Sequence, residues 1–421
     1  MPGPQEAARS HRIFRGWWIV IVSIIGQAFG LASMLIYTFG VFAKPLATEF
    51  KTSRASIALA VSLVDIILAI TAPGAGRLVD RYGARGVIVS SLLALQACLV
   101  GLCFVQPPLW HFYALYAFAG LVSVATTPVT YSRVIVNWFD RKRGLALGLA
   151  STGVGLGAFI SPSLAQFLID ESGWRNAYLG LAAVGLLVAV PVVGIFLRGS
   201  PEEVGLLPDD ASSVGQQLPP GMPRQGITVL EALKTRTFWQ LCAIFFCVAA
   251  CGNGAIAHLA PLLTDHGVTG REAALATSMF GIATIVGRVG NGYLIDCFFA
   301  PRVTSILFGG AAVGAALLWG GATGYGAFLA SALLGLAIGA EADVMPFLIS
   351  RYFGMRSMAE LYGCVFGAYT LGNAAGRYLM AVGFDTTGSY QIPLACGFAA
   401  LVLAVIATLL LGKYPKFAAT A

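Results

Sequence analysis

Twelve apolar segments account for most of this 421-residue chain. Each has about 20 residues or more, which is the length an α-helix needs to cross the hydrocarbon core of a bilayer. Only 11% of the residues are charged, against about 25% in soluble domains, so we predict an all-α membrane protein. The segments are 16–43, 53–76, 86–106, 109–137, 144–169, 175–198, 237–264, 272–296, 301–322, 325–350, 357–383 and 389–412.

The basic residues predict how these segments are oriented. With both termini in the cytoplasm, eighteen of the 26 Lys and Arg residues fall on the cytoplasmic side and five on the outer side. This bias satisfies the positive-inside rule, and it explains the net charge of +7 through anionic lipid, without nucleic acid. We therefore predict a multi-pass protein of the cytoplasmic membrane. Three arginines remain within the segments: Arg133, Arg288 and Arg377.

The chain repeats itself at about half its length. Gly76 and Asp80 follow the second segment, and Gly292 and Asp296 follow the eighth, each shifted by 216 residues. Two related halves of six helices are the plan of many secondary transporters, in which the substrate binds between the halves near the middle of the membrane. We predict an N-terminal bundle at 1–198, a cytoplasmic linker at 199–236 and a C-terminal bundle at 237–421.

The loop after the second segment resembles the signature of the major facilitator superfamily. It reads Gly-Arg-Leu-Val-Asp-Arg-Tyr-Gly-Ala-Arg at 76–85, and the repeat extends the resemblance over both halves. The resemblance implies twelve transmembrane helices in two pseudo-symmetric six-helix bundles. Asp80 can cap a helix start and pair with arginines, although the loop could also serve orientation alone. We assign conformational gating to Gly76, Asp80, Arg81, Gly83, Arg85 and Asp296.

A narrower resemblance is to the monocarboxylate and oxalate porters. Three stretches carry it: Gly16-Trp-Trp, the glycine-rich run from Trp138 to Gly157, and Arg288-Val-Gly-x-Gly292. In that branch the arginine of the eighth segment binds the substrate carboxylate, which implies the same role for Arg288. Animal members carry the coupled proton on an aspartate one turn earlier. This chain has Thr284 there, so a coupling acid must come from elsewhere.

Arg288 is also the buried charge that most strongly indicates function from physical chemistry alone. Holding an arginine at mid-membrane costs about 2.5–3.5 kcal/mol on insertion scales, and its planar fork matches a carboxylate. The alternative role is a buried ion pair with Glu341 or Asp343. We assign further substrate contacts to Tyr37, Tyr131, Asn291, Phe366 and Tyr369.

Four side chains within the segments are candidates for proton coupling: Glu341, Asp343, His258 and Asp65. Glu341 and Asp343 are two residues apart and point to different faces of a helix, so we expect one of them to face the cavity. A shift of 221 residues relates His258 to Tyr37, so we expect the two to face each other across the outer half of the cavity. Structural hydrogen bonding is the alternative role for each candidate.

The two other intramembrane arginines lie nearer the surfaces, where we expect Arg133 and Arg377 to snorkel. In the oxalate exchangers a second cation on the eleventh segment helps to hold the dianion, at about the place of Tyr369 here. One central cation and a phenol suit a monocarboxylate better than a dicarboxylate.

We therefore predict a secondary transporter of a small monocarboxylate, such as a lactate-like or aromatic acid. It would act by alternating access with proton symport, as a monomer without cofactor or metal. An organic-anion exchanger, or an exporter of amphipathic compounds, is the alternative. A membrane sensor is a remote one, because the longest polar segment has only about forty residues. No nucleophile–base or metal constellation indicates an enzyme.

Overall fold

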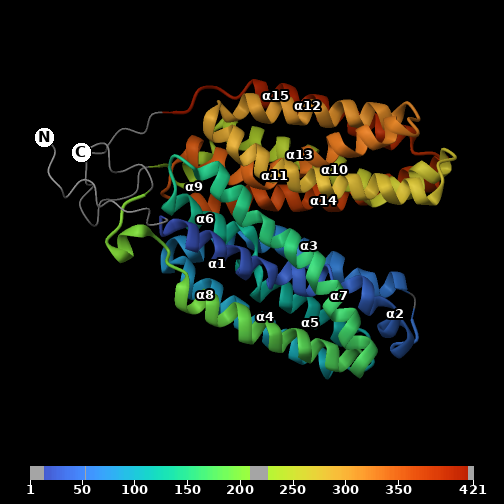
Figure 1. Ribbon diagram of the computed structural model, residues 1–421, viewed down its shortest axis with the longest axis horizontal. Coiled ribbons are helices and arrows are strands. Elements are labelled where there is room, and N and C mark those ends of the chain that lie inside the picture. The colour runs from blue at the N-terminus through green and yellow to red at the C-terminus, as the bar shows by residue number, and fades with distance from the viewer. Residues whose placement is uncertain (1–13, 53, 209–225, 416–421) are drawn as a thin grey trace, which may run out of the picture.

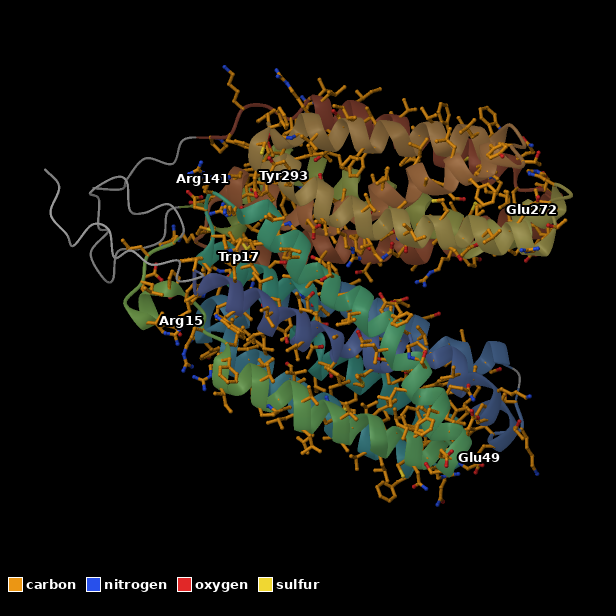
Figure 2. The ribbon with its side chains drawn as sticks, in the orientation of Figure 1. Arg15, Trp17, Glu49, Arg141, Glu272 and Tyr293 are labelled. Carbon is orange, nitrogen blue, oxygen red and sulfur yellow. The ribbon has the colours of Figure 1, made fainter. Side chains whose placement is uncertain are left out.

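The computed structural model describes residues 14–52, 54–208 and 226–415. Figure 1 shows two helical bundles that meet at one end and diverge towards the other. The segment joining the bundles lies at the meeting end, which we call the linker end; the opposite end is the far end. Figure 2 shows Arg15 and Arg141 at the linker end, and Glu49 and Glu272 at the far ends of the two bundles. The predicted position of both termini, and 209–225 of the predicted linker, fall outside the described residues.

The N-terminal bundle contains the first six spans. Gly173 has a φ of 79°, a conformation that favours glycine, and the kink there separates spans five and six. The elements are α1 (Gly16–Ala28), η1 (Ala32–Ile36), α2 (Phe39–Glu49), α3 (Arg54–Tyr82), α4 (Ala84–Cys103), α5 (Trp110–Val122), η2 (Val124–Thr126), α6 (Pro128–Trp138), α7 (Arg143–Val184), η3 (Gly185–Ala189) and α8 (Val190–Phe196).

The C-terminal bundle contains six uninterrupted helices. Thr269 and Glu272 form a capping box at the start of α11, which satisfies backbone N–H groups that the helix leaves unpaired. The linker contributes η4 (Pro201–Val204) and α9 (Val229–Leu233), and the bundle comprises α10 (Arg236–Asp265), α11 (Gly270–Cys297), α12 (Ala300–Trp319), α13 (Tyr325–Phe353), α14 (Met358–Thr387) and α15 (Gln391–Leu409).

The predicted twelve spans are all present as helices. Nine segments of the described chain are both long and apolar enough to cross a membrane. One of them, Arg143–Phe196, contains two spans joined at Gly173. Span four is divided between α5 and α6, and α14 is long enough but carries more polar side chains. The fold is therefore a twelve-helix, pseudo-symmetric pair of bundles.

Spans one and four were expected to be continuous, and the structure corrects this. Span one leaves α-helical geometry after Ala28 and passes through the π-helical turn η1 before it resumes at Phe39. Span four breaks at Thr127, which is extended with a ψ of 166°. Pro128 follows, and its ring disfavours helical geometry at the residue before it. The break in span one has no such signal in the sequence, whereas Pro128 was a visible signal for the break in span four.

The break in span four satisfies a backbone group of the break in span one. The N–H of Leu31, just after the end of α1, donates to the Thr126 hydroxyl oxygen at 2.9 Å. A Cβ on Gly30 would lie 2.8 Å from the Thr126 carbonyl oxygen, so only glycine lets the two segments approach this closely. Non-helical backbone at membrane depth is tolerated where it is buried in protein or lines a cavity.

An aspartate from each bundle caps a helix of the other bundle at the linker end. Both Asp80 carboxylate contacts with α14 come from one oxygen, which accepts the N–H groups of Ala359 and Glu360 at 3.1 Å each. The Asp296 carboxylate accepts the N–H groups of Gly144 and Leu145 on α7 at 2.7 and 2.9 Å. Acceptors placed at a helix N-terminus satisfy unpaired donors and complement the helix dipole.

Glycines allow these caps to form. A Cβ on Gly292 would lie 2.5 Å from the Gly144 carbonyl oxygen, and one on Gly76 would collide with the Ala359 carbonyl group. The sequence repeat thus places Gly76 with Asp80, and Gly292 with Asp296, at equivalent contacts between the bundles. Gly83, with a φ of 85°, makes the turn between α3 and α4.

Asp80 also pairs with an arginine, but not with one from its own loop. Its partner is Arg133 on α6, whose Nε lies 2.9 Å from the carboxylate. Arg133 also donates to the Met355 carbonyl oxygen at 3.1 Å, so its predicted snorkelling is wrong. Arg81 and Arg85 are exposed. The ion pair of Asp80 is buried because its partner, Arg133, comes from a neighbouring span and not from the exposed loop.

Candidate functional site

A cavity of about 230 Å³ lies between the two bundles. Both halves contribute to its wall, through α3, α7 and the broken spans one and four on one side and α10, α11, α13 and α14 on the other. The lining includes Leu31, Ala32, Tyr37, Asp65, Thr127, Pro128, Ser151, Asn253, Arg288, Ala342, Met345, Tyr362, Phe366, Tyr369, Asn373 and Arg377. The breaks at Leu31 and Pro128 therefore place irregular backbone at the cavity wall.

Arg288 occupies the cavity wall from α11. One Nη donates a hydrogen bond of 2.5 Å to the Ser151 carbonyl oxygen on α7. Its Nε is buried and has no hydrogen-bond partner among the described residues. No described carboxylate lies within the 4.0 Å that defines an ion pair with Arg288. The alternative of a contact ion pair with Glu341 or Asp343 is thus not what the structure forms.

Close helix packing holds Arg288 in this position. A Cβ on Gly148 of α7 would lie 2.6 Å from the Arg288 carbonyl oxygen, and one on Gly339 of α13 would lie 3.0 Å from the Arg288 nitrogen. Small residues at both contacts let α7 and α13 approach α11, as glycines do between membrane helices. The two glycines therefore fix where the base of the Arg288 side chain lies.

Two carboxylates lie beside Arg288 rather than in contact with it. Glu341 and Asp343 are both fully buried on α13, and each interacts electrostatically with Arg288. Asp343 accepts a hydrogen bond of 2.6 Å from the Ser151 hydroxyl, while its second oxygen has no partner among the described residues. The Tyr369 hydroxyl faces Glu341, whose two oxygens make no hydrogen bond of ordinary geometry within the described chain.

The expectation that one of these acids faces the cavity needs correction. Ala342, which lies between them, lines the cavity, while Glu341 and Asp343 flank it on either side of α13. Both carboxyl groups are therefore covered by protein in this conformation. They reach the cavity through intermediaries, Tyr369 for Glu341 and Ser151 for Asp343.

Asp65 and Arg377 form an ion pair across the cavity. Asp65 on α3 and Arg377 on α14 are joined by an N–O distance of 2.7 Å. The expectation that Arg377 snorkels did not include this partner, and Asp65 likewise has a charged partner from the other bundle. The side chain of Asp65 is 14% exposed and that of Arg377 is 44% exposed, so the arginine is the more accessible partner.

Aromatic side chains provide the apolar part of the wall. Phe366 and Tyr369, one turn apart on α14, stack with ring centroids 5.6 Å apart. Tyr37 lines the cavity from the segment between η1 and α2, and its hydroxyl interacts electrostatically with both Arg288 and Asp65. These three predicted contacts do lie at the cavity.

Three other predicted residues lie away from the cavity. Tyr131 is fully buried, and it packs where a Cβ on Gly26 of α1 would meet its ring. Asn291 is buried and donates to the Ala340 carbonyl oxygen at 3.4 Å, so it faces α13. His258 bonds to the Tyr390 hydroxyl at 3.3 Å and to the Arg377 carbonyl oxygen at 3.4 Å. It therefore packs within the C-terminal bundle and does not face Tyr37 across the cavity.

The sequence analysis missed several polar residues of the wall, among them Ser151, Asn253 and Asn373. Ser151 matters most, because its carbonyl oxygen and its hydroxyl bond two different charged groups of the other bundle. The two asparagines could have been predicted from the sequence, because an amide within an apolar span requires a polar partner or a polar cavity. Ser151 could not have been predicted in this way, because serines also occur at packed helix contacts in membranes.

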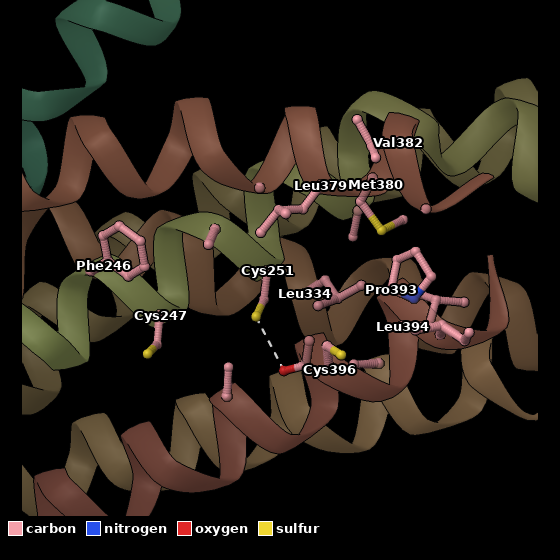
Figure 3. A pocket seen from close by; sticks show the side chains of 18 residues that line it. Phe246, Cys247, Cys251, Leu334, Leu379, Met380, Val382, Pro393, Leu394 and Cys396 are labelled. Atoms are coloured by element: carbon pink, nitrogen blue, oxygen red, sulfur yellow. Dashed lines mark hydrogen bonds between the residues drawn. The ribbon is translucent and has the colours of Figure 1, made fainter. Parts of the chain in front are cut away.

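A second cavity, of about 400 Å³, lies within the C-terminal bundle (Figure 3). Its wall is apolar and contains the thiols of Cys247, Cys251 and Cys396. The Cys251 thiol donates to the Gly397 carbonyl oxygen at 3.1 Å, which accounts for its polar hydrogen. No charged residue is among those that line this cavity in the described chain, so it offers an anion no counter-charge.

Relatives of the chain include two carriers of small anions. Monocarboxylate transporter 11 of Mus musculus is 28% identical over 393 residues, covering 89% of this chain and 83% of that protein. The Oxalate:formate antiporter of Oxalobacter formigenes is 25% identical over 440 residues, covering 99% and 97%. An uncharacterized MFS-type transporter of Escherichia coli, YhjX, is 26% identical over 362 residues and covers 85% of each chain.

Solved structures share the fold. A bacterial homologue of the iron transporter ferroportin, in its outward-facing state, superposes with a TM-score of 0.71 at 13% identity, covering 94% of this chain and 98% of that one. The E. coli fucose:proton symporter gives a TM-score of 0.67 at 15% identity, covering 95% and 99%. The family model of the Major Facilitator Superfamily matches residues 24–376. Because this match spans more than half of the chain, the protein belongs to the major facilitator superfamily.

Proposed function

We propose that this protein carries a small monocarboxylate across the membrane by alternating access, in symport with protons. The observation that carries the proposal is the state of Arg288. Its guanidinium lines the cavity between the bundles, makes no ion pair with a described carboxylate, and keeps a buried Nε without a hydrogen-bond partner among the described residues. A buried donor on a permanent cation is costly unless an anion completes it.

A carboxylate is the anion that fits this donor best. Nε and one Nη of a guanidinium form a planar fork, which binds both oxygens of a carboxylate through charge-assisted hydrogen bonds. Phe366 and the ring of Tyr369 would then contact the body of the acid, and Tyr37 and Tyr369 would supply hydroxyl groups. This combination favours a lactate-like or aromatic acid. The cavity is formed within one chain, so a monomer is sufficient for the cycle.

Proton symport follows from the balance of charge around the cavity. Three carboxyl groups, from Asp65, Glu341 and Asp343, accompany the two arginines Arg288 and Arg377. A bound monocarboxylate adds one more negative charge to a poorly hydrated site. Like charges in such a site favour uptake of a proton by one of the acids. Glu341 and Asp343 lie nearest to Arg288 in electrostatic terms, so we assign the coupled proton to one of them.

The contacts at the linker end would act as the gate that opens and closes during the transport cycle. Asp80 and Asp296, with Gly76 and Gly292, hold the bundles together there. We assign the linker end to the cytoplasm, because the basic loops lie on this side. The conformation described here then faces outwards, and release of these contacts would open the cavity to the cytoplasm.

The test is uptake of labelled lactate into proteoliposomes that contain the purified protein. An inwardly directed proton gradient should accelerate uptake, and dissipating the gradient with an ionophore should remove the acceleration. If the gradient has no effect while internal lactate accelerates entry, symport is wrong and anion exchange is right. Failure of every short-chain, hydroxy, keto and aromatic acid to enter or compete would reject the substrate class.

Organic-anion exchange is the second candidate, and one observation favours it. Arg377 lines the same cavity as Arg288, so the wall holds two cations. A site with two available cations would suit a dianion. The ion pair between Arg377 and Asp65 argues against binding of a dianion, because Asp65 already balances the charge of the second cation. Counterflow of labelled lactate against internal oxalate or formate separates the two candidates.

A further inference from the structure

The ion pair between Asp65 and Arg377 joins the two bundles beside the central cavity. Asp65 belongs to α3 of the N-terminal half and Arg377 to α14 of the C-terminal half, and 2.7 Å separates their charged atoms. Both residues line the cavity that contains Arg288. The pair is therefore part of the site itself.

The contact with Asp65 uses one nitrogen of Arg377. Nη2 donates to one oxygen of Asp65, and the arginine side chain remains 44% exposed. The Nε2–H of His258 donates to the Arg377 backbone carbonyl oxygen at 3.4 Å, which connects this turn of α14 to α10. The base of the arginine is thus fixed, while its guanidinium lies at the cavity wall with donors available.

The ion pair with Asp65 determines whether one or two cations of the cavity are available to bind an anionic ligand. Tyr37 interacts electrostatically with both Arg288 and Asp65, which places the two charged centres around one space. With Asp65 ionised, the charge of Arg377 is balanced and Arg288 is the cation left for a ligand. Without the Asp65 charge, the same space would present two guanidinium groups. Discrimination between ligands is a difference of affinities, and an existing like charge in the site excludes the wrong ligand.

We propose that Asp65 restricts the cavity to anions of a single negative charge, by holding Arg377 in an ion pair. This inference rests on the proposed function, because it assumes that the central cavity binds an organic anion. A dicarboxylate would have to displace Asp65 from Arg377 and meet its negative charge. A monocarboxylate needs Arg288 alone. Asp65 thus determines specificity without contacting the carboxylate that Arg288 binds.

A purely structural role for the pair predicts something different. If the pair only stabilises the packing of α3 against α14, its removal changes the uptake rates of all substrates by a common factor. If it sets selectivity, its removal changes the ratio between dicarboxylate and monocarboxylate. Malonate and lactate make a matched pair of probes, because both have three carbons and differ in the number of carboxylates.

The experiment uses the full-length protein in proteoliposomes, with the ratio of malonate to lactate uptake as the readout. D65N keeps the shape and a hydrogen-bond acceptor but removes the charge, and it should raise this ratio by at least about tenfold, or about 1.4 kcal/mol. D65E keeps the charge and should leave the ratio near that of the unaltered protein. The double variant D65N/R377Q removes the second cation and should lose the gain.

The outcomes separate this inference from the proposed function. If the unaltered protein carries neither lactate nor any other short-chain, hydroxy, keto or aromatic acid, the proposed function has failed. If it carries lactate and the ratio is unchanged in folded D65N, the inference alone is wrong. Should D65N not be recovered as a monodisperse protein, the unaltered protein still decides, since equal uptake of malonate and lactate by it overturns the inference.

Discussion

The guanidinium of Arg288 on α11 donates a 2.5 Å hydrogen bond to the backbone carbonyl oxygen of Ser151 on α7. This bond crosses from the C-terminal bundle to the N-terminal bundle beside the cavity. The Ser151 hydroxyl makes a second crossing, to Asp343 at 2.6 Å. A carboxylate bound by Nε and the second Nη would share this guanidinium with the first bond. We therefore expect ligand binding and the relative movement of the bundles to be linked at this point.

Arg288→Lys should weaken binding of the monocarboxylate by about tenfold or more, because lysine keeps the charge but loses the planar fork. The measurement is the Kd from ligand-induced thermal stabilisation of the purified protein, with lactate and an aromatic acid. Arg302→Lys is the matched control, since Arg302 is exposed at the start of α12. Equal affinities in both variants would remove Arg288 from the binding site.

Gly76→Ala and Gly292→Ala should disfavour the conformation with a closed linker end. Each new methyl group collides with a carbonyl group of the opposite bundle, and overpacking of this kind costs about 1–3 kcal/mol. Gly74→Ala and Gly290→Ala are controls on the same helices, because a Cβ at either position meets nothing within 4 Å. Labelling of a cysteine introduced at Ser350, beside the closed contact, should increase in the first pair alone.

Neutralising the proton-carrying acid should uncouple transport from the proton gradient. We expect either Glu341→Gln or Asp343→Asn to reduce gradient-driven lactate uptake to its level without a gradient, while lactate–lactate exchange persists. Asp385→Asn, at an exposed position near the end of α14, is the control. If both inner variants still respond to the gradient as the control does, neither acid carries the coupled proton.

Tyr369 and Tyr131, two of the three tyrosines assigned to the substrate from the sequence, should behave differently. Tyr369→Phe removes a hydroxyl at the cavity and should raise the Kd by about two- to tenfold, the effect of one hydrogen bond. Tyr131→Phe should leave affinity unchanged, because its ring is buried and its hydroxyl has no hydrogen-bond partner among the described residues. A larger effect at Tyr131 than at Tyr369 would contradict the position of the cavity.

Much of the fold could be predicted from the sequence, because its determinants are local. A membrane helix needs a long apolar segment, and all twelve were visible as such. The shift of 216 residues paired Gly76 with Gly292 and Asp80 with Asp296, and the structure places both pairs at equivalent contacts. What the repeat did not reveal is the partner of each aspartate, which belongs to the opposite bundle.

The cavity wall was harder to predict, since it depends on distant contacts. Asp65 and Arg377 are 312 residues apart, and neither carries a local signal of the other. Tyr131 and Asn291 were assigned to the cavity from their spans, yet each faces a neighbouring helix. The break at Pro128 resets the helical phase of α6 after α5, so extrapolation along span four fails there. Arg288 was predictable because a lone buried charge is unusual in any helical phase.

The reciprocal capping at the linker end has a consequence for how the protein changes shape. Asp80 caps α14 and Asp296 caps α7, so each bundle contributes one capping aspartate and one capped helix. Separating the bundles removes the caps from the first turns of both helices at once. We expect the linker end to part in a single cooperative step, with half-parted forms too short-lived to leak ions through the membrane.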